Sequence, residues 1–241
     1  MLLQAALNGA RTRAEHPAVP LTPEDLAADA ASVVAAGVGA LHVHPRDDAG
    51  VETLEPRAVA AALDAIRAAC PGIPVGVSTG AWIAPGGAAR LSAMRGWRVE
   101  PDYVSINLSE NDAPEVAALA QEMGIDIEAG LWSRGDVARF LHEPWAHRVL
   151  RVLVEINEQG EDEALGAFEG VVAELDEGGW SGSILSHGLD TGFWPLLPAA
   201  LRAGHDLRIG LEDVLVLPDG SPAPGNAALV QAARRRCTVA G

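Results

Sequence analysis

Short apolar runs alternate with longer amphipathic stretches along the whole chain. The apolar runs predict strands at residues 2–7, 39–43, 74–78, 102–107, 125–129, 150–156, 183–186 and 207–211. The Ala- and Leu-rich stretches between them predict helices at residues 23–36, 56–69, 113–123, 135–141, 161–175, 193–203 and 226–236. This regular order of strand and helix is typical of a parallel sheet with helical crossovers.

Residues at the limits of the predicted helices support the pattern. Thr22 stands before Pro23, so a Thr N-cap is followed by Pro at the first helical position. Gly37, Gly124 and Gly204 stand where three helices are expected to end. With eight strands predicted in 241 residues and no linker between them, we expect one α/β domain over residues 1–241, a (β/α)8 TIM barrel. A doubly wound open sheet is the alternative.

Composition narrows the class of protein. Hydrophobic residues make up 49% of the chain but aromatic residues only 4%, so the core must consist mainly of Ala, Val, Leu and Ile. No apolar run approaches the roughly 18 residues of a membrane span, and we expect no signal peptide because the first residues lack a basic segment. Cys70 and Cys237 form no CxxC pair, so we expect a cytoplasmic protein.

Charge excludes several functions. The net charge of −16 disfavours binding to nucleic acid or to an anionic membrane. All 17 basic residues are arginines, so a Schiff-base lysine, a Walker lysine and a carbamylated bridging lysine are impossible. An anionic ligand must therefore be held by arginines, by backbone amides or by a metal ion.

The second predicted strand ends in two histidines. His42 and His44 are two residues apart, so both imidazoles project to the same side of a strand and can bind one metal ion. A pair of hydrogen-bonded core histidines is the alternative. In a TIM barrel the C-terminal ends of strands form the active site, which favours a metal.

The last predicted strand carries charge. Arg208, Gly210 and Glu212 share one side of an extended strand, and an inward arginine needs a carboxylate or an anionic ligand. Glu212 is a candidate third metal ligand, which would leave a position open for substrate. Asp213 is a candidate general base whose charge Arg208 would hold. A solvated acidic pair that opens a loop is the alternative.

Other strand ends are polar in the same way. This shared polarity predicts a substrate site at one end of the barrel, although Ser-Thr-Gly is also ordinary turn chemistry. The candidate residues are Ser78, Thr79 and Gly80 after the third strand, Ser105 and Asn107 on the fourth, Glu128 on the fifth, His187 after the seventh and Arg11 after the first, with Trp82, Trp132 and Trp194 as candidate walls.

Together these residues resemble the β-keto acid cleavage enzymes, the family of the 3-keto-5-aminohexanoate cleavage enzyme. The resemblance spans nearly the whole chain, and HxHxRD combined with RxGxED at this separation is specific. It rests on Leu7-Asn8-Gly9-Ala10, Pro20-Leu21-Thr22-Pro23-Glu24, His42-Val43-His44-Pro45-Arg46-Asp47, Val77-Ser78-Thr79-Gly80, Ile127-Glu128, Arg208-Ile209-Gly210-Leu211-Glu212-Asp213 and Ala223-Pro224-Gly225-Asn226-Ala227.

The resemblance implies a zinc-dependent acyltransferase on a TIM barrel. One Zn²⁺ per chain would be bound by His42, His44 and Glu212. The implied reaction joins a β-keto acid with acetyl-CoA and gives acetoacetate and a new acyl-CoA by Claisen and retro-Claisen steps. Arg208 and Asp213 are the implied dyad that deprotonates the keto acid. We also expect a homo-oligomer, a dimer or a tetramer.

The resemblance implies further roles and one departure. Ser78 and Ser105 would hydrogen-bond substrate oxygens, and Glu128 would be an active-site carboxylate. The enzyme for the amino-substituted keto acid has a Glu after its first strand that faces the substrate amine, whereas this chain has Arg11. We therefore expect a β-keto acid whose distal end is neutral or anionic.

Two other functions are compatible with the residues. A metal-dependent TIM-barrel hydrolase would act without CoA, but its HxH belongs on the first strand rather than the second. A non-catalytic metal- or metabolite-binding barrel is the second alternative. Consumption of acetyl-CoA distinguishes both from the acyltransferase.

Overall fold

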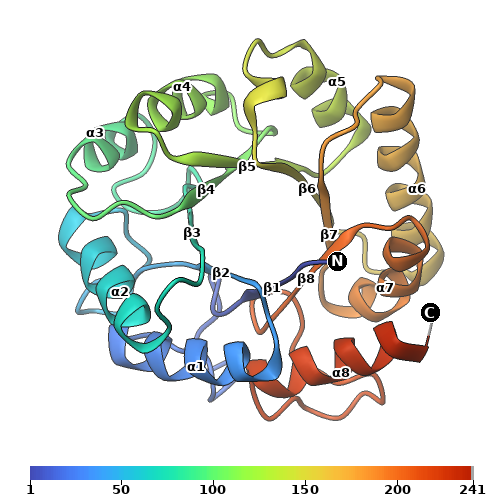
Figure 1. Ribbon diagram of the computed structural model, residues 1–241, viewed down its shortest axis with the longest axis horizontal. Helices are drawn as coiled ribbons and strands as arrows, with labels where there is room; N and C mark the ends of the chain where they lie inside the picture. Colours follow the sequence, from blue (N-terminus) through green and yellow to red (C-terminus); the bar gives the residue numbers. More distant parts are fainter. Residues whose placement is uncertain (240–241) are drawn as a thin grey trace.

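Each predicted apolar run forms a strand, and the strands pair in chain order until β8 closes against β1 (Figure 1). The computed structural model describes residues 1–239. All neighbouring strands are parallel, so the expected TIM barrel is confirmed. The strands are β1 (Leu3–Ala6), β2 (Ala40–Val43), β3 (Val75–Ser78), β4 (Tyr103–Asn107), β5 (Asp126–Leu131), β6 (Arg151–Ile156), β7 (Ile184–Gly188) and β8 (Asp206–Ile209).

The α-helices cover the outer face of the barrel (Figure 1). At the start of α1, the Thr22 side chain accepts from the N–H of Asp25 and the Asp25 side chain accepts from the N–H of Thr22, as the sequence predicts for a capped helix. Gly37 ends α1 in the left-handed conformation that glycine adopts readily. The helices are α1 (Pro23–Ala36), α2 (Pro56–Ala69), α3 (Ala89–Arg95), α4 (Ala113–Met123), α5 (Arg134–His142), α6 (Glu161–Glu177), α7 (Phe193–Arg202) and α8 (Asn226–Val239).

Two local predictions were wrong. Helix α3 was missed because it has only seven residues and its buried face includes Arg90, which breaks the apolar pattern. Strand β8 ends at Ile209 rather than at residue 211, because the chain turns there: the N–H groups of Asp213 and Val214 both donate to the carbonyl of Gly210. Glu212 therefore lies in this turn and not on the strand.

A buried polar cluster fills the barrel near the N-terminal ends of the strands. Gln4 donates to the Tyr103 hydroxyl (2.8 Å) and to Glu128 (2.9 Å), and Arg151 donates to Glu128 (2.6 Å). Tyr103 and Arg151 are the first residues of their strands, which places the cluster toward that end. Gly76 leaves the space for the Tyr103 ring, because a Cβ at residue 76 would lie 2.0 Å from it.

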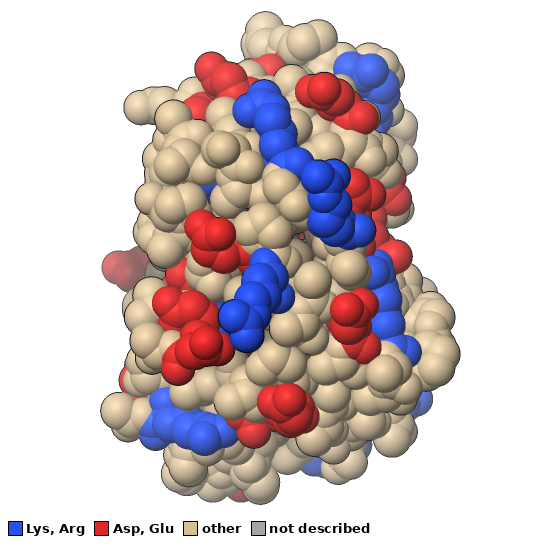
Figure 2. Space-filling model, turned by 90° about the vertical axis from the view of Figure 1, so that its left-hand side faces the viewer, with Lys and Arg blue, Asp and Glu red and all other residues tan. Residues whose placement is uncertain are grey.

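The outer surface carries charges of both signs. Figure 2 shows the side of the barrel on which α2 and α3 lie, where acidic and basic side chains are interspersed. On this side of the barrel the basic side chains therefore form no continuous patch. Within residues 1–239, no helix combines the length and the apolar character that crossing a membrane requires.

Candidate active site

A cavity of about 340 Å³ opens at the C-terminal ends of the strands. This is the end at which TIM-barrel enzymes carry their active sites. Of the residues that the sequence predicts for the site, ten line this cavity and Thr79, Gly80, Glu128, His187, Trp194 and Asp213 do not. The ten are Arg11, His42, His44, Ser78, Trp82, Ser105, Asn107, Trp132, Arg208 and Glu212.

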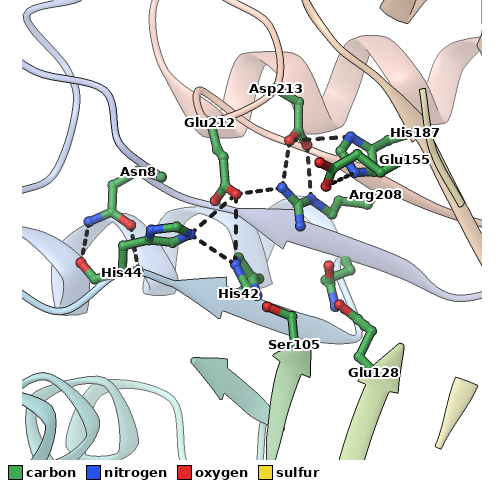
Figure 3. Close-up of polar contacts among 12 residues, drawn as sticks. Asn8, His42, His44, Ser105, Glu128, Glu155, His187, Arg208, Glu212 and Asp213 are labelled. Carbon is green, nitrogen blue, oxygen red and sulfur yellow. Dashed lines mark hydrogen bonds and ion pairs between the residues drawn. The ribbon is translucent and has the colours of Figure 1, made fainter. Parts of the chain in front are cut away.

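Three candidate metal ligands converge on one point at the floor of the cavity (Figure 3). The Nε2 atoms of His42 and His44 are 3.2 Å apart, and the nearer oxygen of Glu212 lies 3.7 Å from the first and 3.3 Å from the second. Tetrahedral ligands that are each about 2.0–2.1 Å from one zinc ion lie about 3.3 Å from one another. The triangle therefore has the size and the donor chemistry of a three-ligand catalytic metal site.

An unpaired oxygen atom of Glu212 also indicates a metal site. The second carboxylate oxygen of Glu212 is buried and has no hydrogen-bond partner in the described chain. A buried carboxylate oxygen without a partner is costly unless a cation compensates it. The set His42, His44 and Glu212 thus fits a divalent ion.

The electrostatics keep Glu212 ionised. Burial raises its pKa, but Arg208, His44 and His42 outweigh this effect and hold the pKa well below its usual range. Burial lowers the pKa of His42 well below its ordinary value. Burial also lowers the pKa of His44, yet Glu212 and Glu52 overcome it and raise that pKa to about 9.

Two residues that the sequence did not assign to the site hold His44 in place. Asn8 is fully buried; its oxygen accepts from the His44 N–H (2.9 Å), and its amide donates to the His44 carbonyl (2.9 Å) and to the Pro20 carbonyl (3.2 Å). Glu52 lies 2.5 Å from the Nδ1 atom of His44. A carboxylate on the far ring nitrogen fixes the tautomer and orientation of a metal-binding histidine.

The turn after β8 brings neighbouring residues to the same arginine. Arg208 donates to Glu212 (2.5 Å) and to both oxygens of Asp213 (2.8 and 3.3 Å). On an extended strand the two carboxylates would point to opposite faces. Gly210 allows the turn to pass close to β1, because a Cβ there would lie 1.8 Å from the Ala6 carbonyl oxygen.

Behind Arg208, Asp213 belongs to a chain of buried groups. Asp213 has no exposed surface, and His187 lies 3.3 Å from it and 3.1 Å from Glu155, which lines the cavity (Figure 3). Burial raises the pKa of Asp213, although Arg208 and His187 oppose this shift. For Glu155, burial raises the pKa, but His187 outweighs it, so the pKa is lowered. Arg208 lines the cavity and contacts Asp213, whereas Asp213 itself does not line it, so Arg208 stands between Asp213 and the cavity.

The polar residues at the C-terminal ends of β3 and β4 divide into cavity-facing and supporting groups. Ser78 and Ser105 both line the cavity, and their residues pair across the two strands. The Thr79 hydroxyl instead donates to the Ser105 carbonyl (2.6 Å) and is buried. Gly80 lies under the Trp82 ring, to which a Cβ would approach within 2.5 Å. Thr79 and Gly80 thus shape the walls rather than face the cavity.

Arg11 faces the cavity but is held by two acidic residues. Its guanidinium contacts Asp190 (2.5 Å) and Glu15 (3.3 Å), and its side chain is 20% exposed. Asp190 has a positive φ of 44°, which is uncommon for a residue other than glycine. The positive charge of Arg11 is therefore compensated by the carboxylates of Asp190 and Glu15.

Glu128 lies outside the cavity lining. It is fully buried and ion-paired with Arg151 in the cluster that also contains Gln4 and Tyr103. Its strand begins at Asp126, so Glu128 stands early on β5 rather than at its end, contrary to the sequence analysis. A role for Glu128 as an active-site carboxylate stays a prediction.

Glu155, Glu52 and Asn8 were not assigned to the site from the sequence, and the sequence signal for the three differs. Glu155 stands between Val154 and Ile156 in strand β6, and a charged residue inside an apolar run is a signal that the sequence did offer. Glu52 lies in a loop among other acidic residues, where spacing carries no such signal. Asn8 stands in a motif of the family resemblance, but its two-sided contact with His44 depends on the pairing of β1 with β2.

Comparisons with known proteins point to one family. A model of the beta-keto acid cleavage enzyme family matches residues 1–241. The 3-keto-5-aminohexanoate cleavage enzyme of Fusobacterium nucleatum is 24% identical over 254 residues, which cover 96% of this chain and 89% of that protein. A 3-oxoadipate:acetyl-CoA acetyltransferase of Cupriavidus necator is 26% identical over 268 residues, which cover 100% of this chain and 89% of that protein.

A solved structure shares the fold. The ternary complex of ObcA with a C4-CoA adduct and oxalate superposes with a TM-score of 0.75 at 16% identity, over 92% of this chain. This chain spans 64% of the ObcA chain, less than two thirds of its length. At that identity the likeness concerns the fold alone. The family model, which matches this chain from its first residue to its last, shows that the protein belongs to the β-keto acid cleavage enzyme family.

Proposed function

We propose that this protein is an acyltransferase that condenses a β-keto acid with acetyl-CoA to give acetoacetate and a new acyl-CoA. One observation carries the proposal. At the floor of one cavity, Glu212 completes the candidate metal site with His42 and His44 and also accepts from Arg208, which in turn pairs with Asp213. The match to the family model along residues 1–241 supports it, as does the 3-oxoadipate:acetyl-CoA acetyltransferase among the relatives.

The exchange forms one carbon–carbon bond and breaks another. The carbon between the two carbonyl groups of the keto acid loses a proton and attacks the acetyl thioester, which expels CoA as a thiolate. The thiolate then attacks the original β-keto carbon, and cleavage of the adjacent carbon–carbon bond releases acetoacetate as a carbanion that takes the proton back. The products are acetoacetate and the acyl-CoA of the original acyl group.

Residues of this chain supply the acid–base and binding groups. Asp213 is the base, and burial gives it a raised pKa that suits this role. Arg208 binds the substrate carboxylate, and sharing its guanidinium with that carboxylate uncovers Asp213 behind it. Ser78 and Ser105 donate hydrogen bonds to substrate oxygens from the cavity wall.

His42, His44 and Glu212 would hold the metal ion, which we propose to be Zn²⁺, one per chain. When bound, the ion supplies Lewis-acid polarisation of the β-keto oxygen, which makes the neighbouring carbon more acidic. Asn8 and Glu52 keep the His44 ring directed at this point.

We propose that the distal end of the keto acid is neutral or anionic. Arg11 lines the cavity, in the loop where the family resemblance implies a glutamate that faces a substrate amine in the enzyme for the amino-substituted keto acid. Because Asp190 and Glu15 already pair with Arg11, an anionic substrate has to displace one of them. The preference is therefore graded rather than absolute.

The test is a product assay on metal-loaded enzyme. Acetyl-CoA is mixed with matched β-keto acids that end in methyl, carboxylate or ammonium groups, and acetoacetate and the new acyl-CoA are both quantified. We expect both products in equal amounts with wild type and neither with His42→Ala, which leaves two ligands for the ion. Formation of CoA without acetoacetate would indicate thioester hydrolysis and contradict the proposal.

A further inference from the structure

The residues that line the cavity divide into two halves by the strands that carry or precede them. Figure 1 shows the order of these strands around the barrel. The half that follows β7, β8, β1 and β2 carries the three metal ligands, Arg208 and Arg11. The half that follows β3 to β6 is almost neutral, with Glu155 as its charged member among the lining residues. Its other side chains include Trp82, Asn107, Trp132, Leu153 and Asn157.

Trp82 forms an exposed apolar face at the mouth of the neutral half. It is 53% exposed and is the one aromatic residue among the exposed large hydrophobic side chains of the described chain. The ring packs over Gly80, whose missing side chain leaves the space for it. An exposed aromatic ring at the rim of a cavity offers an apolar contact face to a ligand.

Trp132 adds a donor to the same half. Its indole N–H is buried and has no acceptor in the described part of the chain. The same holds for Trp145 and Trp180, but of these three side chains Trp132 is the one that lines the cavity. Buried donors are nearly always satisfied in folded proteins and their complexes. A ligand amide carbonyl supplies such an acceptor.

The two halves match the two substrates of the proposed function, on which this inference rests. The keto acid carries a carboxylate and a polarised ketone, which suit the charged half. Acetyl-CoA reaches the site through its pantetheine arm, which is neutral and contains two amides. A cavity of about 340 Å³ lies at the lower end of the roughly 300–1,000 Å³ typical of small-ligand sites, so most of CoA must lie across the mouth.

We propose that the half of the mouth formed by β3 to β6 seats the pantetheine arm of acetyl-CoA, with Trp82 as its outer contact face. Asn107 and Asn157 hydrogen-bond the amides of the arm, and Trp132 donates to one of their carbonyls. The thioester then lies over Ser78 and Ser105, on the two strands that follow β2, which carries His42.

The test measures binding of CoA itself to the metal-loaded protein by titration calorimetry, so no turnover is required. Trp82→Ala should weaken CoA binding about tenfold, whereas Trp82→Phe, which keeps an aromatic face, should stay within about threefold of wild type. Gly80→Ala should weaken it as well, because the new Cβ displaces the indole. Trp194→Ala is the control, since Trp194 lies outside the cavity lining and should leave CoA binding unchanged.

Steady-state kinetics add a second measurement. In Trp82→Ala, KM for acetyl-CoA should rise while KM for the keto acid stays within about twofold of wild type. The kcat/KM for a truncated N-acetylcysteamine thioester should fall much less than the kcat/KM for acetyl-CoA. If Trp82→Ala binds CoA as wild type does, or loses keto acid and CoA affinity alike, the inference is wrong. If wild type itself neither binds CoA nor forms acetoacetate, the proposed function is wrong and this inference with it.

Discussion

Replacing Asn8 by alanine should destabilise the protein and weaken its metal site together. The Asn8 side chain makes three hydrogen bonds, two to the backbone of His44 and one to the Pro20 carbonyl, in a fully buried position. Alanine makes none of them, and each polar group left buried without a partner costs about 1–3 kcal/mol. Because carbonyls tolerate this better than N–H groups, we expect the free energy of unfolding to fall by about 3–5 kcal/mol in total.

The effect on the metal follows from the same contacts. His44 lies just beyond the end of β2, so Asn8 rather than a strand partner holds its backbone. Loss of such outer support typically lowers metal affinity about 10–100-fold. Urea unfolding of the chelated protein measures the first effect, and zinc competition with a chromogenic chelator measures the second.

Asn157→Ala is the matched control. Asn157 also follows the end of a strand and lines the cavity, but its side chain makes no hydrogen bond within the described chain. Its replacement should change the unfolding free energy by less than about 0.5 kcal/mol. The reasoning is refuted if Asn8→Ala costs less than about 1 kcal/mol, or if zinc affinity stays at the wild-type value while stability falls.

Three further outcomes are expected. Asp213→Asn should lower kcat by about 10²–10⁴ while elemental analysis still finds one metal ion per chain, and normal turnover would show that the base is another residue. Arg11→Glu should shift the kcat/KM ranking about tenfold toward an ammonium-ended keto acid, and an unchanged ranking would remove Arg11 from specificity. Burial raises the pKa of Asp29 from 3.8 to about 6, so the folded state holds this proton to a higher pH than the unfolded state does. As pH rises from about 4 to about 6, the free energy of unfolding of wild type should therefore fall by up to about 3 kcal/mol relative to that of Asp29→Asn, which urea unfolding across this range measures.

The sequence by itself determined the barrel and the paired histidines. Strands and helices were visible because each element buries its own apolar face, and that face repeats with a local period. His42 and His44 were assigned together for the same reason, since side chains two apart on a strand must share a side. The missed helix α3 shows the limit of this reasoning, because its buried face includes Arg90, which Glu110 and Asp112 neutralise from the loop after β4.

Only the tertiary structure decided how the remaining groups meet. Glu212 and Asp213 both reach Arg208 because the chain turns at Gly210, which an extended strand would not allow. Arg11 was visible in the sequence, but its partner Asp190 is 179 residues away. Such contacts depend on strand register and loop paths, which are set by packing over the whole barrel, whereas hydrophobic periodicity reports only on neighbours along one element.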